Sequence, residues 1–288
     1  MRVLVTGAAG YLGGAVVPAL VTSGFLVRAL VRGTPPEHLR ETEVVRGDVV
    51  TGAGVEAAAA DCAAVVHLVG IIRERPGATM AGVHVEGTRR VLRAAQRAGA
   101  RRFVHLSAVG ADVRGPTAYQ RSKGAAEALV TSSDLAWTVI RPTVVFGPGG
   151  PGDNLVRQLG GLLSAAPWVP VVGDGRYLLQ PVAAPDVATL CARSLQSPAT
   201  AGGIYEAGGP ERLTYLEVLR RIAAASGRPL RPLHVPVGLI RPLLPLLEHV
   251  PGFPLTADQL TMLLRGNVCD AEPCWAAFGL TPQRFTGR

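Results

Sequence analysis

The stretch RVLVTGAAGYLGG, residues 2–14, decides the fold of this chain. A short apolar run that is typical of a buried strand passes directly into three glycines, Gly7, Gly10 and Gly13. This GxxGxxG spacing suits a tight turn, a close approach of backbone to an anion, and close packing of the following helix. The free N–H groups and the dipole of that helix favour a pyrophosphate. The sequence therefore predicts a dinucleotide-binding turn at the start of a parallel sheet.

Short apolar runs alternate with alanine-rich helical segments from this turn to about residue 146. Strands that are buried on both faces read as continuous apolar runs, and helices between them imply crossover connections. The predicted fold class is therefore α/β, a Rossmann-type doubly wound parallel sheet. The further strands are expected at residues 25–31, 43–45, 63–69, 102–107 and 137–145.

The alternation becomes irregular after Phe146, where glycine- and proline-rich segments interrupt it. We expect an NAD(P)-binding Rossmann domain over residues 1–146, to which residues 182–227 return. A smaller C-terminal substrate lobe is expected from residues 147–181 and 228–288.

Composition argues against several classes of function. The net charge of +8 arises from single or paired arginines without interleaved aromatics, which make up only 5% of the 288 residues, so no nucleic-acid partner is expected. The four cysteines lack CxxC spacing and nearby histidines, which predicts reduced thiols and no metal site. The strand pattern begins at the N-terminus and leaves no room for the charged region and cleavable apolar stretch of a signal peptide, so a cytoplasmic protein is expected.

An apolar tract, HVPVGLIRPLLPLLEHV, covers residues 234–250. It contains Arg241 and several prolines and is too short to span a bilayer. We expect a helix pair that lines a pocket. Contact with a membrane surface, and a location at the periphery of the inner membrane, remain open.

The end of the second predicted strand bears on the choice of nucleotide. An acid there would accept a hydrogen bond from the ribose 2′-hydroxyl of NAD, but this chain has Arg32. A guanidinium can pair with a 2′-phosphate, so NADP(H) is favoured and NAD(H) stays open. Arg32 could also be an ordinary solvated strand end. Asp48 either accepts from the adenine amino group or caps the next helix.

Lys123 is the only lysine in the chain, and it follows Tyr119 by four residues in AYQRSK, residues 118–123. On a helix the two side chains project from the same face. A phenol acts as an acid–base near neutral pH only when a neighbouring cation stabilises the phenolate, and lysine supplies a compact charge for this.

Several segments resemble a known family. TGAAGYLG (6–13), YQRSK (119–123) and IRPTVVFGPG (140–149) resemble the short-chain dehydrogenase/reductase superfamily, in its extended or atypical branch. Residues 84–111, 178–188 and 254–270 resemble bacterial relatives of the accessory nucleotide-binding subunit of respiratory complex I. The resemblance implies a Rossmann fold, a bound NAD(P)(H) and, where catalysis survives, hydride transfer.

The resemblance also implies roles for individual residues. Tyr119 would be the general acid–base, and Lys123 would lower its pKa and hold the nicotinamide ribose. Ser107 would bond the substrate carbonyl, although many extended members place this residue two positions later, at Val109. His84 stands where the family has an asparagine, as a substitute polar group or as a structural histidine.

Two functions follow from these expectations. The first is an NAD(P)-dependent oxidoreductase or epimerase/dehydratase-like enzyme acting on a small molecule, and the apolar tract favours an apolar one. The alternative is a non-catalytic NAD(P)H-binding protein that senses redox state or supports assembly of a larger complex. Besides the glycines, Arg32, Asp48 and Lys123, the expected cofactor site contains Tyr11, Leu12, Val49, Gly70 and Pro142.

Overall fold

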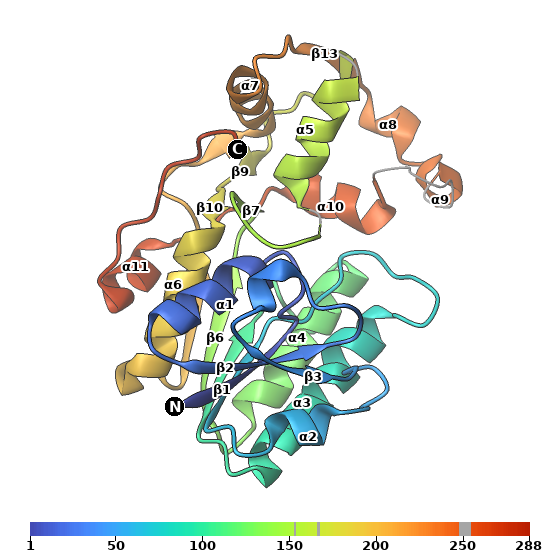
Figure 1. Cartoon of the computed structure of the whole chain (residues 1–288). Coiled ribbons are helices and arrows are strands. Elements are labelled where there is room, and N and C mark those ends of the chain that lie inside the picture. The colour runs from blue at the N-terminus through green and yellow to red at the C-terminus, as the bar shows by residue number, and fades with distance from the viewer. Residues whose placement is uncertain (153, 166–167, 248–254) are drawn as a thin grey trace.

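Seven parallel strands form the central sheet in the computed structural model, which describes residues 1–152, 154–165, 168–247 and 255–288. Their order across the sheet is β11-β6-β5-β4-β1-β2-β3 (Figure 1). The strands are β1 (Arg2–Thr6), β2 (Leu26–Val31), β3 (Glu43–Arg46), β4 (Ala64–His67), β5 (Arg102–Leu106), β6 (Ala136–Pro142) and β11 (Gly203–Ala207). The predicted doubly wound parallel sheet is confirmed.

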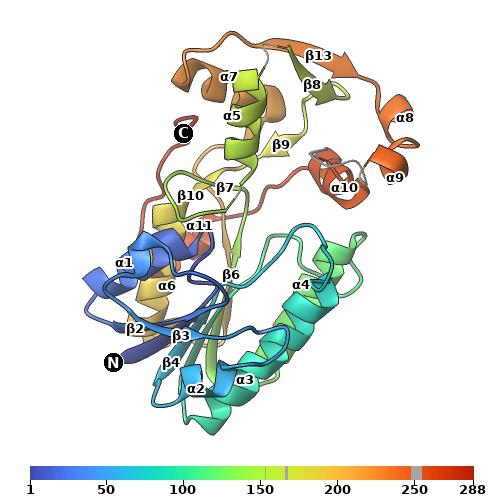
Figure 2. The same cartoon turned by 45° about the vertical axis from the view of Figure 1, so that its right-hand side comes forward.

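Helices cover both faces of the sheet (Figure 2). In β1, Val3 and Val5 point into one apolar cluster while Leu4 points into the other, as the two-residue period of a strand requires. The first cluster lies under α1 (Gly13–Thr22), α6 (Ala184–Gln196) and α11 (Glu272–Phe278). The second lies under α2 (Val55–Ala59), α3 (Gly87–Arg97) and α4 (Ala118–Thr131).

The strand order reverses beside β1. The chain passes from β1 outward to β2 and β3, and then returns to place β4 on the other side of β1. The loops that follow β1 and β4 consequently diverge at the carboxyl edge of the sheet. In open α/β sheets ligands bind at such a reversal.

A second group of elements stands above the carboxyl edge of the sheet (Figure 1). The short strands β7 (Val145–Phe146) and β10 (Val182–Ala183) lead to it. Its own elements are α5 (Leu155–Ala165), β8 (Trp168–Val172), β9 (Leu178–Leu179), β12 (Leu213–Thr214), α7 (Tyr215–Ala225), β13 (Arg231–Val235), α8 (Val237–Ile240), α9 (Leu244–Leu247) and α10 (Ala257–Arg265).

Two helices do not pack in the part of the molecule to which the expected division of the chain assigned them. Residues 182–227 were expected to return to the sheet, but α7 shares an apolar cluster with α5, through Leu219 and Leu159. Helix α11 lies within the expected substrate lobe, but Trp275 and Phe278 pack into the cluster under α1 and α6. The apolar face of each helix determines where it packs, and the residues on which it packs lie far away in the sequence.

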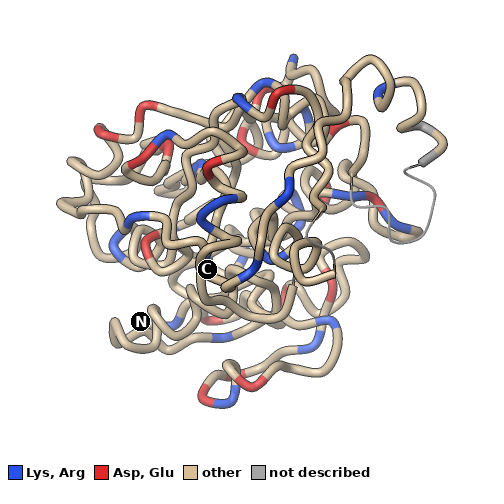
Figure 3. Tube along the Cα trace, turned by 90° about the horizontal axis from the view of Figure 1, so that it is seen from above, with Lys and Arg blue, Asp and Glu red and all other residues tan. Residues whose placement is uncertain are grey.

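Charged residues are spread along the chain. Basic and acidic residues are scattered among uncharged ones along the trace (Figure 3), as the single and paired arginines of the sequence predict. Across the described ranges, no helix combines the length and the apolar character needed to cross a membrane.

Candidate functional site

The glycine turn forms the floor of a cavity of about 550 Å³ at the strand reversal. Gly7 has φ +76°, a left-handed conformation that favours glycine, and a Cβ there would lie 3.0 Å from the backbone of Leu68. A Cβ on Gly13 would lie 2.0 Å from the carbonyl oxygen of Ala8, so α1 can start this close to the turn only with glycine. The N–H groups of Gly14 and Val16 already donate to the carbonyls of Gly10 and Leu12, so the N–H groups of the turn just before them are the ones suited to an anion.

Nine of the residues expected to bind the nucleotide line this cavity. They are Gly7, Gly10, Tyr11, Leu12, Gly13, Arg32, Asp48, Val49 and Gly70. The expected Lys123 and Pro142 are not among the lining residues, nor are Tyr119 and Ser107. Thr34 and Ile71 also line the cavity, and neither was predicted from the sequence.

Arg32 and Asp48 mark the end of the cavity beside β2. The Arg32 Nη1 lies 4.0 Å from the Asp48 Oδ2, and the Arg32 side chain is 69% exposed, so its guanidinium can turn towards a ligand. Asp48 Oδ1 also accepts from the N–H of Val50 at 2.8 Å. The capping role considered for Asp48 is wrong, because α2 begins at Val55 after Gly54.

A second glycine-rich segment, residues 147–152, crosses over the first. The Tyr11 hydroxyl donates to the carbonyl oxygen of Gly147 at 3.0 Å, and the Gly150 N–H donates to the Tyr11 carbonyl at 2.8 Å. A Cβ on Gly14 would lie 1.9 Å from the Gly150 nitrogen, so the two backbones are in direct contact. From the sequence this segment was a break in the alternation, and its residues 147–149 belonged to a stretch that resembles the family, but its contact with the first turn was not predicted because the two parts are distant in the chain.

Lys123 reaches the far end of the cavity from α4. Its Nζ donates to the carbonyl oxygen of Leu106 at 3.0 Å and lies 3.2 Å from where a Cβ on Gly70 would stand. Gly70 lines the cavity and Lys123 does not, so only a residue without a side chain separates the buried ammonium from the cavity. Burial lowers the pKa of Lys123 to about 8, against the opposing effect of the Glu127 carboxylate.

Tyr119 lies one turn before Lys123 and is partly buried. Its ring meets His84 edge-on, with 5.7 Å between the ring centroids. Burial raises the pKa of Tyr119 to about 12. The resemblance implied that Lys123 would lower this pKa, but the cause that acts on it here is the lost hydration of the phenolate. The phenol is therefore protonated at neutral pH.

His84 is held on both ring nitrogens. Its Nε2 accepts from the N–H of Ile71 at 2.9 Å, and its Nδ1 lies 2.8 Å from the Ser122 Oγ, which itself donates to the Tyr119 carbonyl. These partners require the neutral Nδ1–H tautomer, and burial together with Lys123 lowers the pKa of His84 to about 3. It is a structural histidine that joins the loop after β4 to α4, from within the π-helical turn Ala81–Glu86.

Ser107 follows β5 and is buried. Its N–H donates to the Ile140 carbonyl at 2.8 Å, whereas its hydroxyl has no hydrogen-bond partner within the described part of the chain. Val109 packs against the apolar cluster under α1 and α6, and its N–H donates to the Pro142 carbonyl at 3.0 Å. Of these two positions, only Ser107 therefore offers a polar side chain, at the carboxyl end of β5.

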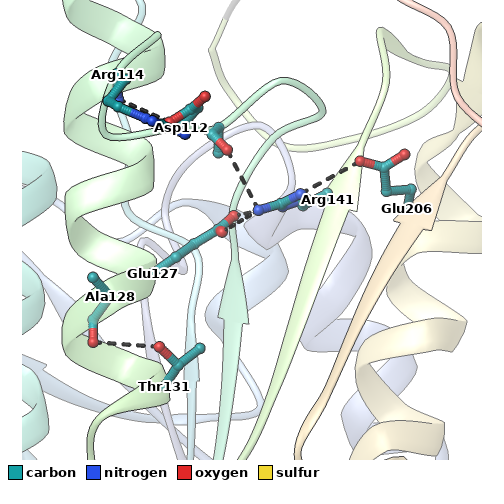
Figure 4. A network of polar contacts seen from close by, with 8 residues as sticks. Asp112, Arg114, Glu127, Ala128, Thr131, Arg141 and Glu206 are labelled. Atoms are coloured by element: carbon teal, nitrogen blue, oxygen red, sulfur yellow. Dashed lines mark hydrogen bonds and ion pairs between the residues drawn. The ribbon is translucent and has the colours of Figure 1, made fainter.

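Arg141, the neighbour of the expected cofactor residue Pro142, is engaged in ion pairs. Its Nε and Nη2 donate to the two carboxylate oxygens of Glu127 at 2.9 and 2.6 Å, and its Nη1 lies 3.5 Å from Glu206 (Figure 4). Glu127 is on α4, one turn beyond Lys123. The ion pair therefore fixes the helix that carries Tyr119 and Lys123 against β6.

Comparisons with known proteins agree with this site. Residues 7–163 match the family model described as NAD(P)H-binding. The chain is 30% identical over 239 residues to the ceramide reductase of Caulobacter vibrioides, which covers 81% of this chain and 73% of that protein. It is 27% identical over 224 residues to NADH dehydrogenase (ubiquinone) 1 alpha subcomplex subunit 9 of Arabidopsis thaliana, covering 74% of this chain and 55% of that protein.

A solved structure extends the comparison to three dimensions. The Thermus thermophilus UDP-glucose 4-epimerase, crystallised with NAD, has a TM-score of 0.72 and 27% identity, covering 82% of this chain and 86% of that one. The glycine turn at the strand reversal and the family match agree with one another. The chain belongs to the NAD(P)H-binding family, as an extended short-chain dehydrogenase/reductase related to the accessory subunits of complex I.

Proposed function

We propose that the chain is an NAD(P)H-dependent oxidoreductase that reduces a carbonyl group, with Tyr119 as proton donor and NADP(H) as the favoured cofactor. The observation that carries the proposal is the position of the Lys123 ammonium. It lies beside Gly70 at the end of the nucleotide cavity, one helical turn from the Tyr119 phenol.

The cavity residues fit the cofactor. Glycines at positions 7, 10 and 13 leave the backbone of the turn free of side chains, so that a pyrophosphate can approach it, and Arg32 supplies a cation for a 2′-phosphate. Bound there, the cofactor supplies the hydride for the reduction.

Residues of α4 would carry out the acid–base step. The protonated Tyr119 phenol donates its proton to the substrate oxygen, and the phenolate that remains regains a proton from solvent. With a pKa of about 8, Lys123 is mostly cationic at neutral pH. We assign it the role of stabilising that phenolate when the cofactor is bound. Its bond to the Leu106 carbonyl holds Nζ in position, so its other protons can be donated to ribose hydroxyls. The Ser107 hydroxyl is the second candidate donor to the substrate oxygen.

An apolar substrate is favoured by the 30% identity to a ceramide reductase. The experiment is to follow NADPH oxidation with long-chain ketones and oxidised ceramides. Tyr119→Phe is expected to reduce turnover by about 10²–10⁴-fold while NADPH binds as before. The matched control, Tyr205→Phe on β11, is expected to turn over normally. Equal activity of wild type and Tyr119→Phe would reject the proton-donor role.

A non-catalytic role is the second candidate. It is favoured by the similarity to a complex I subunit and by the two departures from the family pattern, Val109 and His84. It predicts that wild-type protein binds NADPH but oxidises it with none of the carbonyls tested. It also predicts that a strain carrying only Tyr119→Phe keeps the function that deletion removes.

A further inference from the structure

The segment that contains α8 and α9, residues 237–247, has two apolar faces. Val237, Ile240 and Leu244 face inward and pack against Leu260 of α10. Their spacing of three and four residues is that of one helical face. This inner face accounts for the attachment of the segment to the second lobe.

The outer face is also made of leucine. Leu239, Leu243 and Leu246 are 63%, 51% and 74% exposed, and their positions i, i+4 and i+7 place them on one side of the segment. Turn hydrogen bonds, such as Leu243 N–H to the Ile240 carbonyl at 3.1 Å, keep the chain helical between the two short helices. Three leucines held on one exposed face bury little apolar area in the isolated chain. We call them the leucine rim.

Neighbouring strands add to this surface. Strand β13 leads directly into α8 and pairs with β8, and on these strands Leu233 and Trp168 are 53% and 56% exposed. Figures 1 and 2 show β13, α8 and α9 along the outer border of the second lobe, away from the seven-stranded sheet. The Arg231 guanidinium lies 5.3 Å from the centre of the Trp168 ring, an arrangement common at polar–apolar boundaries.

Arginines outnumber acidic residues in the sequence around the leucine rim. Residues 218–247 contain five arginines and neither aspartate nor glutamate, Glu248 follows directly, and Arg241 lies between the rim leucines in the sequence. A second copy bound through a twofold contact would bring the same arginines face to face, which costs free energy. An anionic phospholipid surface instead offers apolar depth for the leucines and phosphates for the arginines.

We propose that the leucine rim docks the protein on the surface of membranes rich in anionic phospholipid. The rim is joined to the candidate catalytic helix through α10. There the Asp258 Oδ2 accepts from the Ala118 N–H at the start of α4, at 2.8 Å, while Leu260 packs on Leu244. Docking would therefore bring the membrane close to α10, which contacts the start of α4, the helix that carries Tyr119. The proposal does not depend on catalysis.

The test is sedimentation of the whole chain with vesicles of phosphatidylglycerol and phosphatidylcholine. Wild type is expected to sediment with the mixed vesicles, and more weakly with phosphatidylcholine alone or at high salt. The triple variant Leu239→Gln/Leu243→Gln/Leu246→Gln is expected to lose at least about tenfold in affinity, and Arg241→Gln about fivefold. Matched controls are Leu26→Gln/Ile204→Gln, at exposed apolar positions of β2 and β11, and Arg97→Gln on α3.

Thermal unfolding of each variant checks that the fold is kept, since the substituted side chains are exposed. Vesicle binding that is absent in wild type, or unchanged in the triple variant, would overturn the proposal. So would a wild-type dimer that the triple variant converts to a monomer, because the rim would then be a contact between copies. Equal losses in rim and control variants would show that general surface charge or apolarity is responsible, and would also overturn it.

Discussion

Arg141 and Glu127 form a two-pronged ion pair, with Nε to Oε1 at 2.9 Å and Nη2 to Oε2 at 2.6 Å. The Glu127 side chain is 6% exposed, and the pair joins β6 to the middle of α4. Because Glu127 follows Lys123 by one turn, the same carboxylate that anchors the helix also acts on the candidate catalytic lysine.

Glu127→Gln is expected to destabilise the protein by about 2–4 kcal/mol, because it leaves the partly buried Arg141 guanidinium without its two-pronged partner and with only the more distant Glu206 carboxylate. Chemical denaturation measures this difference. The control is Glu56→Gln, which removes an exposed ion pair with Arg97 and should cost at most about 1 kcal/mol. Equal stability of the two variants would show that the Arg141 pair does not fix α4.

The pKa of Lys123 predicts a pH dependence of stability. Burial lowers this pKa from 10.5 to about 8, so between these values the unfolded chain binds more protons than the folded one. Stability contributed by this group therefore rises with pH across the window from 8 to 10.5, by up to about 3 kcal/mol. The measurement is the difference in unfolding free energy between wild type and Lys123→Met at each pH. A difference that stays flat would mean that Lys123 titrates normally.

Arg32→Glu is expected to weaken NADPH binding by about ten- to a hundredfold, because a carboxylate would repel the 2′-phosphate that the guanidinium would bind. NADH, which lacks this phosphate, should bind at least as well as before. Calorimetric titration of both cofactors gives the ratio. Arg40→Glu repeats the charge change outside the cavity lining. A parallel loss of both cofactors in Arg32→Glu would argue that Arg32 does not select between them.

Gly70→Ala tests the access of Lys123 to the cavity. The added methyl group would stand 3.2 Å from Nζ and 3.6 Å from the His84 Nε2, so the ammonium must shift. We expect weaker cofactor binding and at least about tenfold slower turnover. Gly161→Ala on α5 is the control, because nothing lies within 4 Å of its added methyl group. Normal turnover in Gly70→Ala would show that the position of Nζ is not critical.

The sheet and the nucleotide cavity could be predicted because their signals are local. Apolar runs of strand length and the spacing of Gly7, Gly10 and Gly13 fix the turn, and the strand reversal brings Gly70 to it. The predicted helix carrying Tyr119 and Lys123 likewise rests on neighbouring residues alone.

Long-range contacts could not be predicted in the same way. From the sequence, His84 was either a substitute polar group or a structural histidine. Its ring nitrogens contact Ile71 and Ser122, and these contacts favour the structural role. The tract 234–250 was expected to form a helix pair lining a pocket. Helices α8 and α9 do form, but none of its described residues lines the nucleotide cavity, and residues 248–250 lie outside the described ranges. Which face of such a segment is buried depends on its tertiary partner, here α10.

The central claim is that NADPH, held by the glycine turn, reaches the Lys123 ammonium. Because Lys123 is the only lysine, protein grown with 15Nζ-labelled lysine gives a single side-chain signal. The account predicts that this signal shifts and saturates at one equivalent of NADPH, and that Gly70→Ala reduces the shift. NADPH that binds by calorimetry but leaves the signal unmoved would contradict it.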